Sequence, residues 1–260
     1  MEVDRRGFIK IAGLVVAGLA IPPVFNVFSS TEMPKTLESG TLAKAKLAMV
    51  VKLENCKDGC TDCIDACHSI HNVPDFGNPK DEIKWIWTDP YEHVFPEQQS
   101  EFTEESLKEK PVLVLCNHCD NPPCTRVCPV KATWKREDGI VMMDFHRCIG
   151  CRFCMSACPY GSRSFNWRDP REYIKEANPD FPTRTKGVVE KCNFCEERLR
   201  EGLIPACVEA CKDKALVFGD LEDPNSEVSK LISSNYTLRR HSGLGTEPKV
   251  YYLRQDGTHV

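Results

Sequence analysis

The residues of this sequence that could do chemistry are its cysteines, sixteen among 260 residues. They fall into four runs of four, and in every run three residues separate the last two cysteines. The four runs are Cys56, Cys60, Cys63 and Cys67; Cys116, Cys119, Cys124 and Cys128; Cys148, Cys151, Cys154 and Cys158; and Cys192, Cys195, Cys207 and Cys211. Closely spaced thiolates bind soft metal ions and iron–sulfur clusters, so the sequence predicts four metal centres.

The spacing within the runs indicates which kind of metal centre they form. The third run reads C-x2-C-x2-C-x3-C-P, which is the spacing of bacterial two-cluster ferredoxins. The second run differs only in a middle gap of four residues, the first opens with a gap of three, and the fourth has a middle gap of eleven. In a ferredoxin, three cysteines of a run wrap one cubane cluster and the fourth reaches the neighbouring cluster. The pattern therefore favours four [4Fe–4S] clusters.

Other interpretations of the cysteines predict different chemistry. Structural zinc sites use two C-x2-C pairs with a long stretch between them, so zinc suits the middle runs poorly and stays an alternative for the irregular outer runs. Disulfides would suit an oxidising compartment, although cysteines two residues apart make poor crosslinks. Covalent haem is excluded because no C-x-x-C-H occurs. Three histidines beside cysteines are interpreted as hydrogen-bond donors or surface residues: His68, His118 and His146.

The overall composition is that of a globular, weakly acidic protein. Hydrophobic residues make up 41% of the chain, enough for one or two cores, and the net charge of −4 gives no basic surface for nucleic acid. Cubanes that carry about −2 each with their thiolates would make the loaded protein far more acidic. Four basic residues near cysteines would then raise reduction potentials, or else are ordinary solvated charges: Arg147, Arg152, Lys191 and Arg198.

Residues 1–31 are interpreted as a targeting segment. Arg5 and Arg6 precede an apolar run over 11–21, which Pro22-Pro23 interrupts. Eleven apolar residues are too few to span a bilayer, whereas a basic flank before a short apolar centre is typical of an export signal. The paired arginines resemble the twin-arginine signal, which carries folded proteins to the outer (periplasmic) face of the cytoplasmic membrane. A plain secretory signal and a retained N-terminal anchor are the alternatives.

Short strands must position the cysteine loops. Strand-like segments precede each run of cysteines or follow the last one, at 47–53, 112–115, 140–143, 187–190 and 215–219. The segments 133–137 and 140–144 flank Asp138-Gly139, a strong hairpin signal. The segment 68–110 contains Trp85 and Trp87 and lacks periodicity. We expect it to be an insertion that covers a cluster or meets a partner, with core packing as the alternative role of the tryptophans.

Over residues 45–253 the sequence resembles a family of four-cluster ferredoxin-type electron-transfer subunits of membrane-bound oxidoreductases. The family includes the B subunits of dimethyl sulfoxide, polysulfide and tetrathionate reductases and the NrfC-like subunits that pair with NrfD-type membrane proteins. The motifs that carry the resemblance are Cys128-Pro-Val-Lys-Ala-Thr-Trp-Lys-Arg-Glu-Asp-Gly139, Cys158-Pro-Tyr-Gly161, Cys192-Asn-Phe-Cys-Glu-Glu-Arg198, Gly219-Asp-Leu-Glu-Asp-Pro-Asn225 and Glu247-Pro-Lys-Val-Tyr-Tyr252. Residues 67–74 and 82–87 most resemble the DsrO group, the extracytoplasmic iron–sulfur subunits of the Dsr (DsrMKJOP) complex.

The resemblance implies an α+β fold of tandem ferredoxin-like dicluster domains. One half is inserted into the other, with an extra loop insertion and a C-terminal wrapping tail. The implied organisation is a signal or anchor at 1–31, a first half with the outer clusters at 45–110 plus 186–220, a second half with the inner clusters at 111–185, and the tail at 221–260.

The resemblance also implies which cysteines share a cluster, because paired runs exchange their last cysteines. The inner clusters are then held by Cys116, Cys119, Cys124 with Cys158, and by Cys148, Cys151, Cys154 with Cys128. The outer clusters are held by Cys56, Cys60, Cys63 with Cys211, and by Cys192, Cys195, Cys207 with Cys67. The extra residue between Cys56 and Cys60 departs from the family pattern. The four clusters would form a wire for electrons.

The implied function is electron transfer rather than catalysis. By resemblance, the chain passes single electrons between an NrfD-type quinone-reactive membrane subunit and a multihaem cytochrome c or other redox subunit on the outer face of the membrane, in sulfur metabolism and anaerobic respiration. No nucleic acid and no small-molecule substrate of its own are expected. The alternatives are the B subunit of a molybdenum polysulfide, tetrathionate or dimethyl sulfoxide reductase, and a zinc-stabilised secreted binding module.

Overall fold

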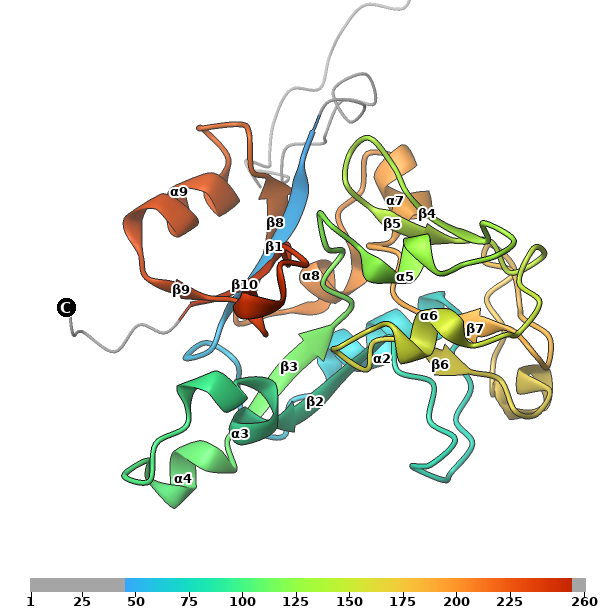
Figure 1. Ribbon diagram of the computed structural model, residues 1–260, viewed down its shortest axis with the longest axis horizontal. Helices are drawn as coiled ribbons and strands as arrows, with labels where there is room; N and C mark the ends of the chain where they lie inside the picture. Colours follow the sequence, from blue (N-terminus) through green and yellow to red (C-terminus); the bar gives the residue numbers. More distant parts are fainter. Residues whose placement is uncertain (1–44, 254–260) are drawn as a thin grey trace, which may run out of the picture. The chain divides into compact units, whose positions relative to one another are not determined.

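The computed structural model describes residues 45–253 as short strands and short helices joined by loops (Figure 1). The expected targeting segment, residues 1–31, lies outside the described residues. Within the described part of the chain, none of the helices is long and apolar enough to cross a bilayer. The strands form one four-stranded sheet and three two-stranded sheets. The cysteine loops therefore depend on several small sheets for their placement.

The largest sheet joins residues from both ends of the described chain (Figure 1). Its strand order is β8-β1-β10-β9, in which β1 is antiparallel to β8 and parallel to β10, and β10 is antiparallel to β9. The bounds of these strands are β1 (Leu47–Lys52), β8 (Leu216–Asp220), β9 (Thr237–Leu238) and β10 (Val250–Leu253). The sheet thus holds together segments that are far apart in the sequence.

The sequence of β1 explains its interior position. Its first five residues are all buried, as expected for a strand that is covered on both faces. Successive side chains point to opposite faces of a strand. The odd-numbered residues of β1 accordingly pack in the largest core, whereas Ala48 and Val50 pack with Val228 of α9 (Glu227–Ser234) in a smaller one.

The three two-stranded sheets carry the remaining strands. They pair β2 (Ile86–Pro90) with β3 (Pro111–Leu115), β4 (Thr133–Lys135) with β5 (Val141–Met143), and β6 (Ser164–Phe165) with β7 (Val189–Glu190), all antiparallel. The strands expected beside the cysteine runs are confirmed as β1, β3, β5, β7 and β8, and the expected hairpin as β4 and β5. Gly139 in the hairpin turn has a φ of +84°, a conformation that favours glycine.

Four of the helices carry the third cysteine of a run. They are α2 (Asp62–Ile70), α5 (Pro123–Arg126), α6 (Phe153–Ser156) and α8 (Ala206–Ala210). The described chain also contains α3 (Tyr91–Val94), α4 (Glu105–Lys108) and α7 (Glu196–Arg200), and short 3-10 helices at Pro96–Gln98, Pro170–Tyr173 and Ser242–Leu244. Because α2 packs against α8, cysteines of the first and fourth runs come together.

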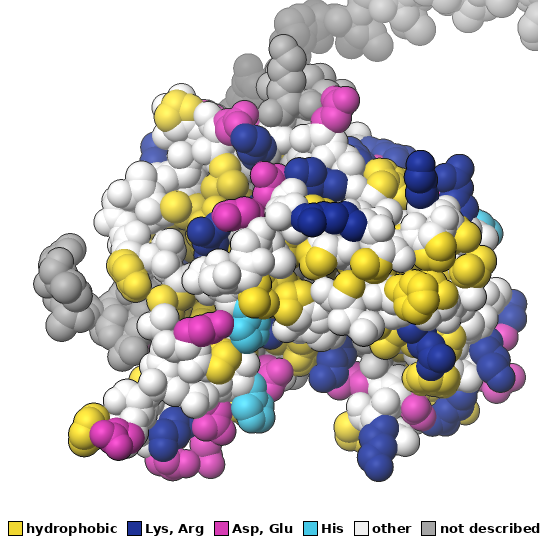
Figure 2. All heavy atoms as spheres, viewed as in Figure 1, with side chains coloured by type: hydrophobic (Ala, Val, Ile, Leu, Met, Phe, Trp, Pro, Cys, Tyr) yellow, Lys and Arg dark blue, Asp and Glu magenta, His cyan; other side chains and the backbone are white. Residues whose placement is uncertain are grey.

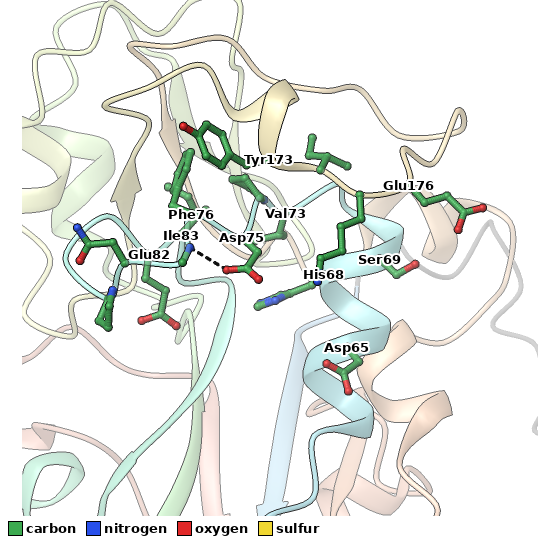
Figure 3. Close-up of a pocket in the computed structure, with 16 residues that line it drawn as sticks. Asp65, His68, Ser69, Val73, Asp75, Phe76, Glu82, Ile83, Tyr173 and Glu176 are labelled. Carbon is green, nitrogen blue, oxygen red and sulfur yellow. Dashed lines mark hydrogen bonds between the residues drawn. The ribbon is translucent and has the colours of Figure 1, made fainter.

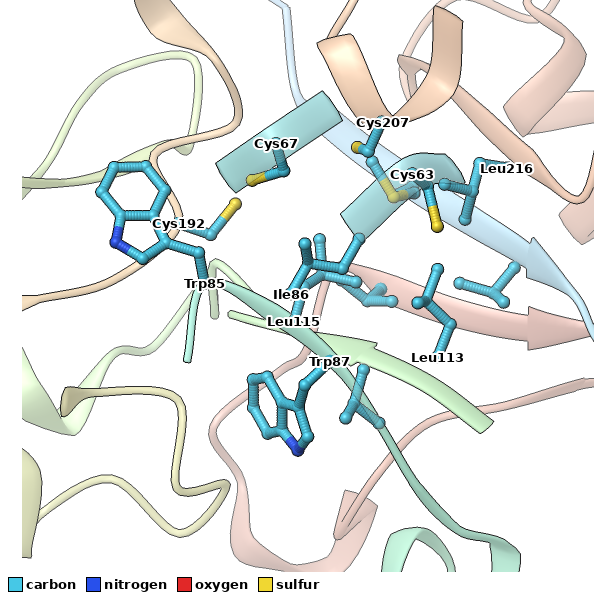
Figure 4. Close-up of a cluster of buried hydrophobic side chains, with 14 of the residues drawn as sticks. Cys63, Cys67, Trp85, Ile86, Trp87, Leu113, Leu115, Cys192, Cys207 and Leu216 are labelled. Atoms are coloured by element: carbon cyan, nitrogen blue, oxygen red, sulfur yellow. The ribbon is translucent and has the colours of Figure 1, made fainter. Parts of the chain in front are cut away.

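The segment 68–110 contributes to the core, and the packing interpretation of its tryptophans is confirmed. Trp85 is fully buried and Trp87 nearly so, and Figure 4 shows both in the buried cluster that also contains Cys67 and Cys192. The indole N–H of Trp85 donates to Glu190 at 2.9 Å. The sequence shows no alternation here because Trp85, Ile86 and Trp87 are all buried. Residues 96–110, which we call the arm, continue beyond this core.

The expectation of a C-terminal wrapping tail needs a correction for residues 250–253. These residues form β10, which lies between β1 and β9 with Tyr252 fully buried. Their Val-Tyr-Tyr-Leu sequence favours a strand. However, a run of four apolar residues after a polar segment is too short for periodicity to predict one.

Candidate metal centres

The sixteen thiols gather into four groups, each of which takes cysteines from two runs. Group 1 consists of Cys56, Cys60, Cys63 and Cys211. Group 2 consists of Cys116, Cys119, Cys124 and Cys158. Group 3 consists of Cys128, Cys148, Cys151 and Cys154. Group 4 consists of Cys67, Cys192, Cys195 and Cys207. These are the sets that an exchange of last cysteines requires, and Cys56 lies in its group despite the stretched gap. The ligand assignment itself stays a prediction.

Three of the groups each line a small cavity. The empty volumes at groups 1, 2 and 3 are about 360, 320 and 270 Å³. Similar volumes and identical donor sets suit one kind of four-thiolate centre at all three places. A cubane cluster binds one thiolate at each of its four irons, so these donor sets fit it. All sixteen cysteines are free of disulfide bonds, so the disulfide interpretation has no support.

The loop of group 3 shows how closely the backbone constrains these sites. Gly150, between two cysteines of the group, has a φ of +69°, and a Cβ at this position would collide with the carbonyl oxygen of Gly187. Arg152 also has a positive φ of 63° and immediately precedes α6. Only glycine fits at position 150, because any side chain would push the loop away from the neighbouring strand.

Backbone amides point at the sulfur atoms of two last cysteines. The N–H of Ala132 donates to Sγ of Cys128, and the N–H of Ala215 donates to Sγ of Cys211, each at 3.2 Å. The two contacts have the same spacing of four residues. Hydrogen bonds to ligand sulfur raise the reduction potential of a bound cluster, so both last cysteines are suited to act as ligands.

Burial keeps the free thiols protonated. Burial first, and then neighbouring thiols, raise the pKa of Cys63 and Cys119 to about 12. The same causes raise the pKa of Cys67 well above its ordinary value. Thiols of this kind lose their protons together only where a metal centre supplies compensating positive charge. The groups are therefore suited to metal ligation and not to nucleophilic chemistry.

The four groups form a row in the order group 1, group 4, group 2, group 3. Neighbouring groups contain thiols close enough for the charge of one to raise the pKa of the other, after the larger effect of burial. The pairs are Cys63 with Cys67, Cys116 with Cys192, and Cys124 with Cys154. Cys60 at the group 1 end is exposed, as is Ile149 in the lining of the group 3 cavity. Both ends of the row thus reach the surface.

Of the basic residues expected near the cysteines, only Lys191 is buried. Its ammonium group donates to the carbonyl oxygens of Val141 and Cys192. The other three are exposed or pair with a carboxylate, in agreement with the interpretation as ordinary charges: Arg147, Arg152 and Arg198.

A buried cation that sequence analysis does not single out lies closer to a thiol. The guanidinium of Arg163 donates to Sγ of Cys124 at 3.0 Å and to Oγ1 of Thr133 at 2.9 Å. Arg163 follows Cys158 by five residues in the sequence, whereas Cys124 belongs to a different run. Only the fold brings the two side chains together, so spacing could not reveal this contact.

The three histidines beside cysteines have different surroundings. His118 is fully buried, stacks on Phe194 with ring centroids 3.7 Å apart, and accepts the backbone N–H of Val141 at Nδ1. His146 is exposed, as the surface interpretation expects. His68 is half-buried, and burial lowers its pKa.

His71 lies closer to a sulfur than these three histidines. Its Nδ1 lies 3.5 Å from Sγ of Cys67 and 2.8 Å from the Cys67 carbonyl oxygen, and its Nε2 lies 2.8 Å from Glu197. Burial lowers the pKa of His71, but hydrogen bonds to Cys195 and Glu197 outweigh it and raise the pKa to about 9. His71, Cys195 and Glu197 come within 4.8 Å of one another. Because Cys195 belongs to group 4, this trio is part of that centre and not a separate metal site.

A wide pocket elsewhere on the molecule has no cysteine in its lining. It lies between α2, the loop over 73–83 and residues 173–176 (Figure 3). Its acidic side chains, among them Asp65, Asp75 and Glu82, stand beside the aromatic rings of Phe76 and Tyr173. We assign this pocket no part in metal binding by the thiols.

A known sequence family matches the part of the chain that holds three cysteine runs. Residues 112–176 and 173–221 match the family described as 4Fe-4S dicluster domain. The two matches include every cysteine of the second, third and fourth runs.

Three curated relatives match most of the chain or nearly all of it. The "Hdr-like menaquinol oxidoreductase iron-sulfur subunit 1" of Archaeoglobus fulgidus is 40% identical, over 98% of this chain and 99% of that protein. A "Putative dimethyl sulfoxide reductase iron-sulfur subunit" of Halobacterium salinarum is 41% identical, over 79% of this chain and 78% of that protein. The "Menaquinone reductase, iron-sulfur cluster-binding subunit" of Nitratidesulfovibrio vulgaris is 38% identical, over 81% and 89%. All three names describe iron–sulfur subunits of oxidoreductases.

Proposed function

Because the chain belongs to the family of iron–sulfur subunits that contain 4Fe-4S dicluster domains, we propose that it is the electron-transfer component of an oxidoreductase complex and not an enzyme on its own. Its sixteen cysteines fit four [4Fe–4S] clusters, and we assign one cluster to each group. The zinc-stabilised binding module is set aside. Each bound cluster takes up and releases one electron.

The observation that carries this proposal is the row of four groups. Electrons that enter at one end can reach the other only through intermediate centres, and groups 4 and 2 stand between the two ends. The two middle groups are buried by strands β1, β3 and β8 and by helices α2 and α8. The chain thereby shields the middle of the row from water while both ends stay accessible.

For the complex, we propose a quinone-linked membrane oxidoreductase of the Dsr type, with an NrfD-type membrane subunit and a cytochrome or other redox subunit as partners. The relative that covers 98% of this chain bears the name of a menaquinol oxidoreductase subunit, which supports the quinone link. The runs 67–74 and 82–87, which resemble DsrO, support the narrower assignment. The electron-transfer subunit of a molybdenum reductase is the second candidate, supported by the 41% identity to the dimethyl sulfoxide reductase protein.

The group 3 end of the row carries an exposed apolar surface. Ile149, Phe153 and Trp167 are 64%, 59% and 48% exposed, and the guanidinium of Arg152 stacks 4.7 Å from the Trp167 ring centroid. Figure 2 shows hydrophobic side chains gathered over α5 and α6, with Lys and Arg side chains around them. Permanent subunit interfaces are more apolar than transient ones. We therefore propose that this group 3 surface binds the permanent membrane subunit.

The group 1 end is polar and lies beside the arm. Lys110 of the arm pairs with Glu54, two residues before Cys56. The arm contains five glutamates against two lysines: Glu97, Glu101, Glu104, Glu105 and Glu109, with Lys108 and Lys110. Charged surfaces speed the encounter of partners that bind and leave. We propose that the exchanging redox partner approaches at this end.

Replacing Phe153 by glutamate tests the proposal for the group 3 surface. The charge would be buried against the membrane subunit without a partner, so we expect the affinity of the complex to fall at least tenfold, about 1.4 kcal/mol. The measurement is the amount of membrane subunit that co-purifies with tagged chain in mild detergent, together with the EPR signals of the four clusters.

The matched control is Phe102→Glu, because Phe102 is an equally apolar residue, 86% exposed, on the arm at the other end. It should leave the membrane subunit bound. Equal loss of the membrane subunit in both variants, or in neither, would show that the group 3 surface is not the permanent interface.

We also propose that the chain is exported by the twin-arginine route and acts on the outer face of the cytoplasmic membrane. The support is the Arg5-Arg6 pair before a short apolar run. Each group takes cysteines from two distant runs, so cluster insertion goes together with folding, and a route for folded proteins suits such a chain.

Replacing both Arg5 and Arg6 by lysine keeps the charge and removes the arginine pair. We expect cluster-loaded protein to accumulate in the cytoplasm and the exported fraction to fall at least tenfold, measured by cell fractionation and immunoblot. Lys10→Arg is the control and should be exported normally. Normal export of the double-lysine variant would refute the route.

A further inference from the structure

Arg163 is a buried cation without a carboxylate partner. Its side chain is 4% exposed, and its guanidinium contacts Sγ of Cys124, Oγ1 of Thr133 and, at 3.7 Å, the sulfur of Met143. Among the ion pairs of the described residues, none involves Arg163. An arginine stays protonated under all ordinary conditions, so its positive charge is left to act on whatever lies nearby.

The groups around Arg163 are group 2 and group 3. Arg163 lines the group 2 cavity. Burial lowers the pKa of the guanidinium, but Cys124, Cys154 and Cys116 raise it overall. Two of these thiols belong to group 2 and one to group 3. The cation therefore lies where two neighbouring centres meet, with its direct hydrogen bond to group 2.

The other buried or nearby cations are compensated. Arg184 pairs with Glu190 at 2.6 Å, both fully buried, and Lys249 lies 3.0 Å from Asp120. At group 1, the basic side chains in the cavity lining pair with acids: Lys57 with Asp213, and Lys212 with Asp62. Lys191 is buried close to group 2, but burial lowers its pKa, so its charge is less secure. A lasting, unpaired charge is thus concentrated at Arg163.

We propose that Arg163 is the residue that raises the reduction potentials of the clusters at groups 2 and 3, with the larger effect at group 2. This inference rests on the proposed function, because it assumes that both groups hold clusters. Reduction adds one electron, and hence one negative charge, to each cluster. A nearby unpaired cation in a site of low dielectric stabilises that charge, and a hydrogen bond to ligand sulfur adds to the effect. No proton accompanies the electron at Arg163.

The test is a potentiometric titration of anaerobically purified chain, followed by low-temperature EPR, with a low-potential chemical reductant as the electron source. Arg163→Gln removes the charge but keeps an N–H donor. At the wild-type midpoint of the group 2 cluster, we expect its reduced-to-oxidised ratio to fall about tenfold, a shift of about 59 mV for one electron. The group 3 signal should shift in the same direction by less, and the signals of groups 1 and 4 should stay in place.

Two further variants separate charge from packing. Arg163→Lys keeps the charge and should stay within a factor of three of the wild-type ratio. Arg126→Gln removes an arginine from α5, the same helix as Cys124, but this side chain is exposed to screening solvent and should shift nothing. If Arg163→Gln fails to load clusters, Arg163→Met supplies the same comparison with a neutral side chain of similar length.

Unchanged group 2 and group 3 potentials in a loaded neutral variant would overturn the inference. Equal shifts of all four signals would also overturn it, because they would indicate a general loosening of the fold. A wild-type chain that shows fewer than four cluster signals would instead contradict the proposed function, so the two failures can be told apart.

Discussion

Replacing Cys67 by alanine is expected to abolish the EPR signal of the cluster at Cys192, Cys195 and Cys207 and to leave the cluster at Cys63 intact. Cys63 and Cys67 lie one turn apart on α2, yet they belong to different groups. Figure 4 shows the sulfur of Cys67 directed toward Cys192. A cluster that loses one of four thiolates is lost or loses an iron. The expected result is therefore the disappearance of one signal of the four.

The companion variant is Cys211→Ala, which should abolish the signal that Cys63→Ala abolishes. Both variants are titrated against potential and read by low-temperature EPR, with iron and sulfide counted in parallel. If Cys67→Ala and Cys63→Ala remove the same signal, each run holds its own cluster and the exchange of last cysteines is wrong for groups 1 and 4.

Removal of the clusters is expected to unfold the segment over 123–165 before the rest of the chain. The core beneath this segment consists of six buried residues, two of which are thiols of groups 2 and 3: Cys124, Ala132, Val141, Met143, Cys154 and Val189. Its sheets have two strands each, which are marginal without other support. Where metal binding organises so small a core, the free energy of binding is largely the free energy of folding.

The measurement is hydrogen exchange followed by mass spectrometry, before and after the iron is removed with an oxidant and a chelator. Loaded protein should contain about sixteen iron and sixteen sulfide per chain, as four cubanes require. After removal, amides of β4 and β5 should exchange at least about a hundredfold faster, roughly 2.8 kcal/mol.

The internal control is β1, which is held between β8 and β10 over the larger core and should keep more of its protection. Equal protection of β4 and β5 with and without clusters would contradict the argument. An iron count near twelve in the loaded protein would instead point to group 1, where Cys56 stands at the stretched gap.

The features that could be predicted from sequence are those that depend on neighbouring residues. The cysteine spacing indicates the kind of cluster, and the apolar segments beside it predict β1, β3 and β8, because each of these patterns is complete within a few residues. Arg163 could not be predicted as a neighbour of Cys124, because the fold brings together two different runs. The same holds for β10, whose four residues become a strand only because β1 offers an unpaired edge.

The position of β10 has a consequence for how the protein is made. The strand that pairs in parallel with β1 is among the last parts of the described chain to leave the ribosome. Until it emerges, β1 lacks one neighbour and Tyr252 is missing from the core. The main sheet therefore closes only after nearly the whole chain has been synthesised. Cofactor insertion and the closing of the sheet become late events, and a chain that stops early yields a product whose oldest strand has an open edge.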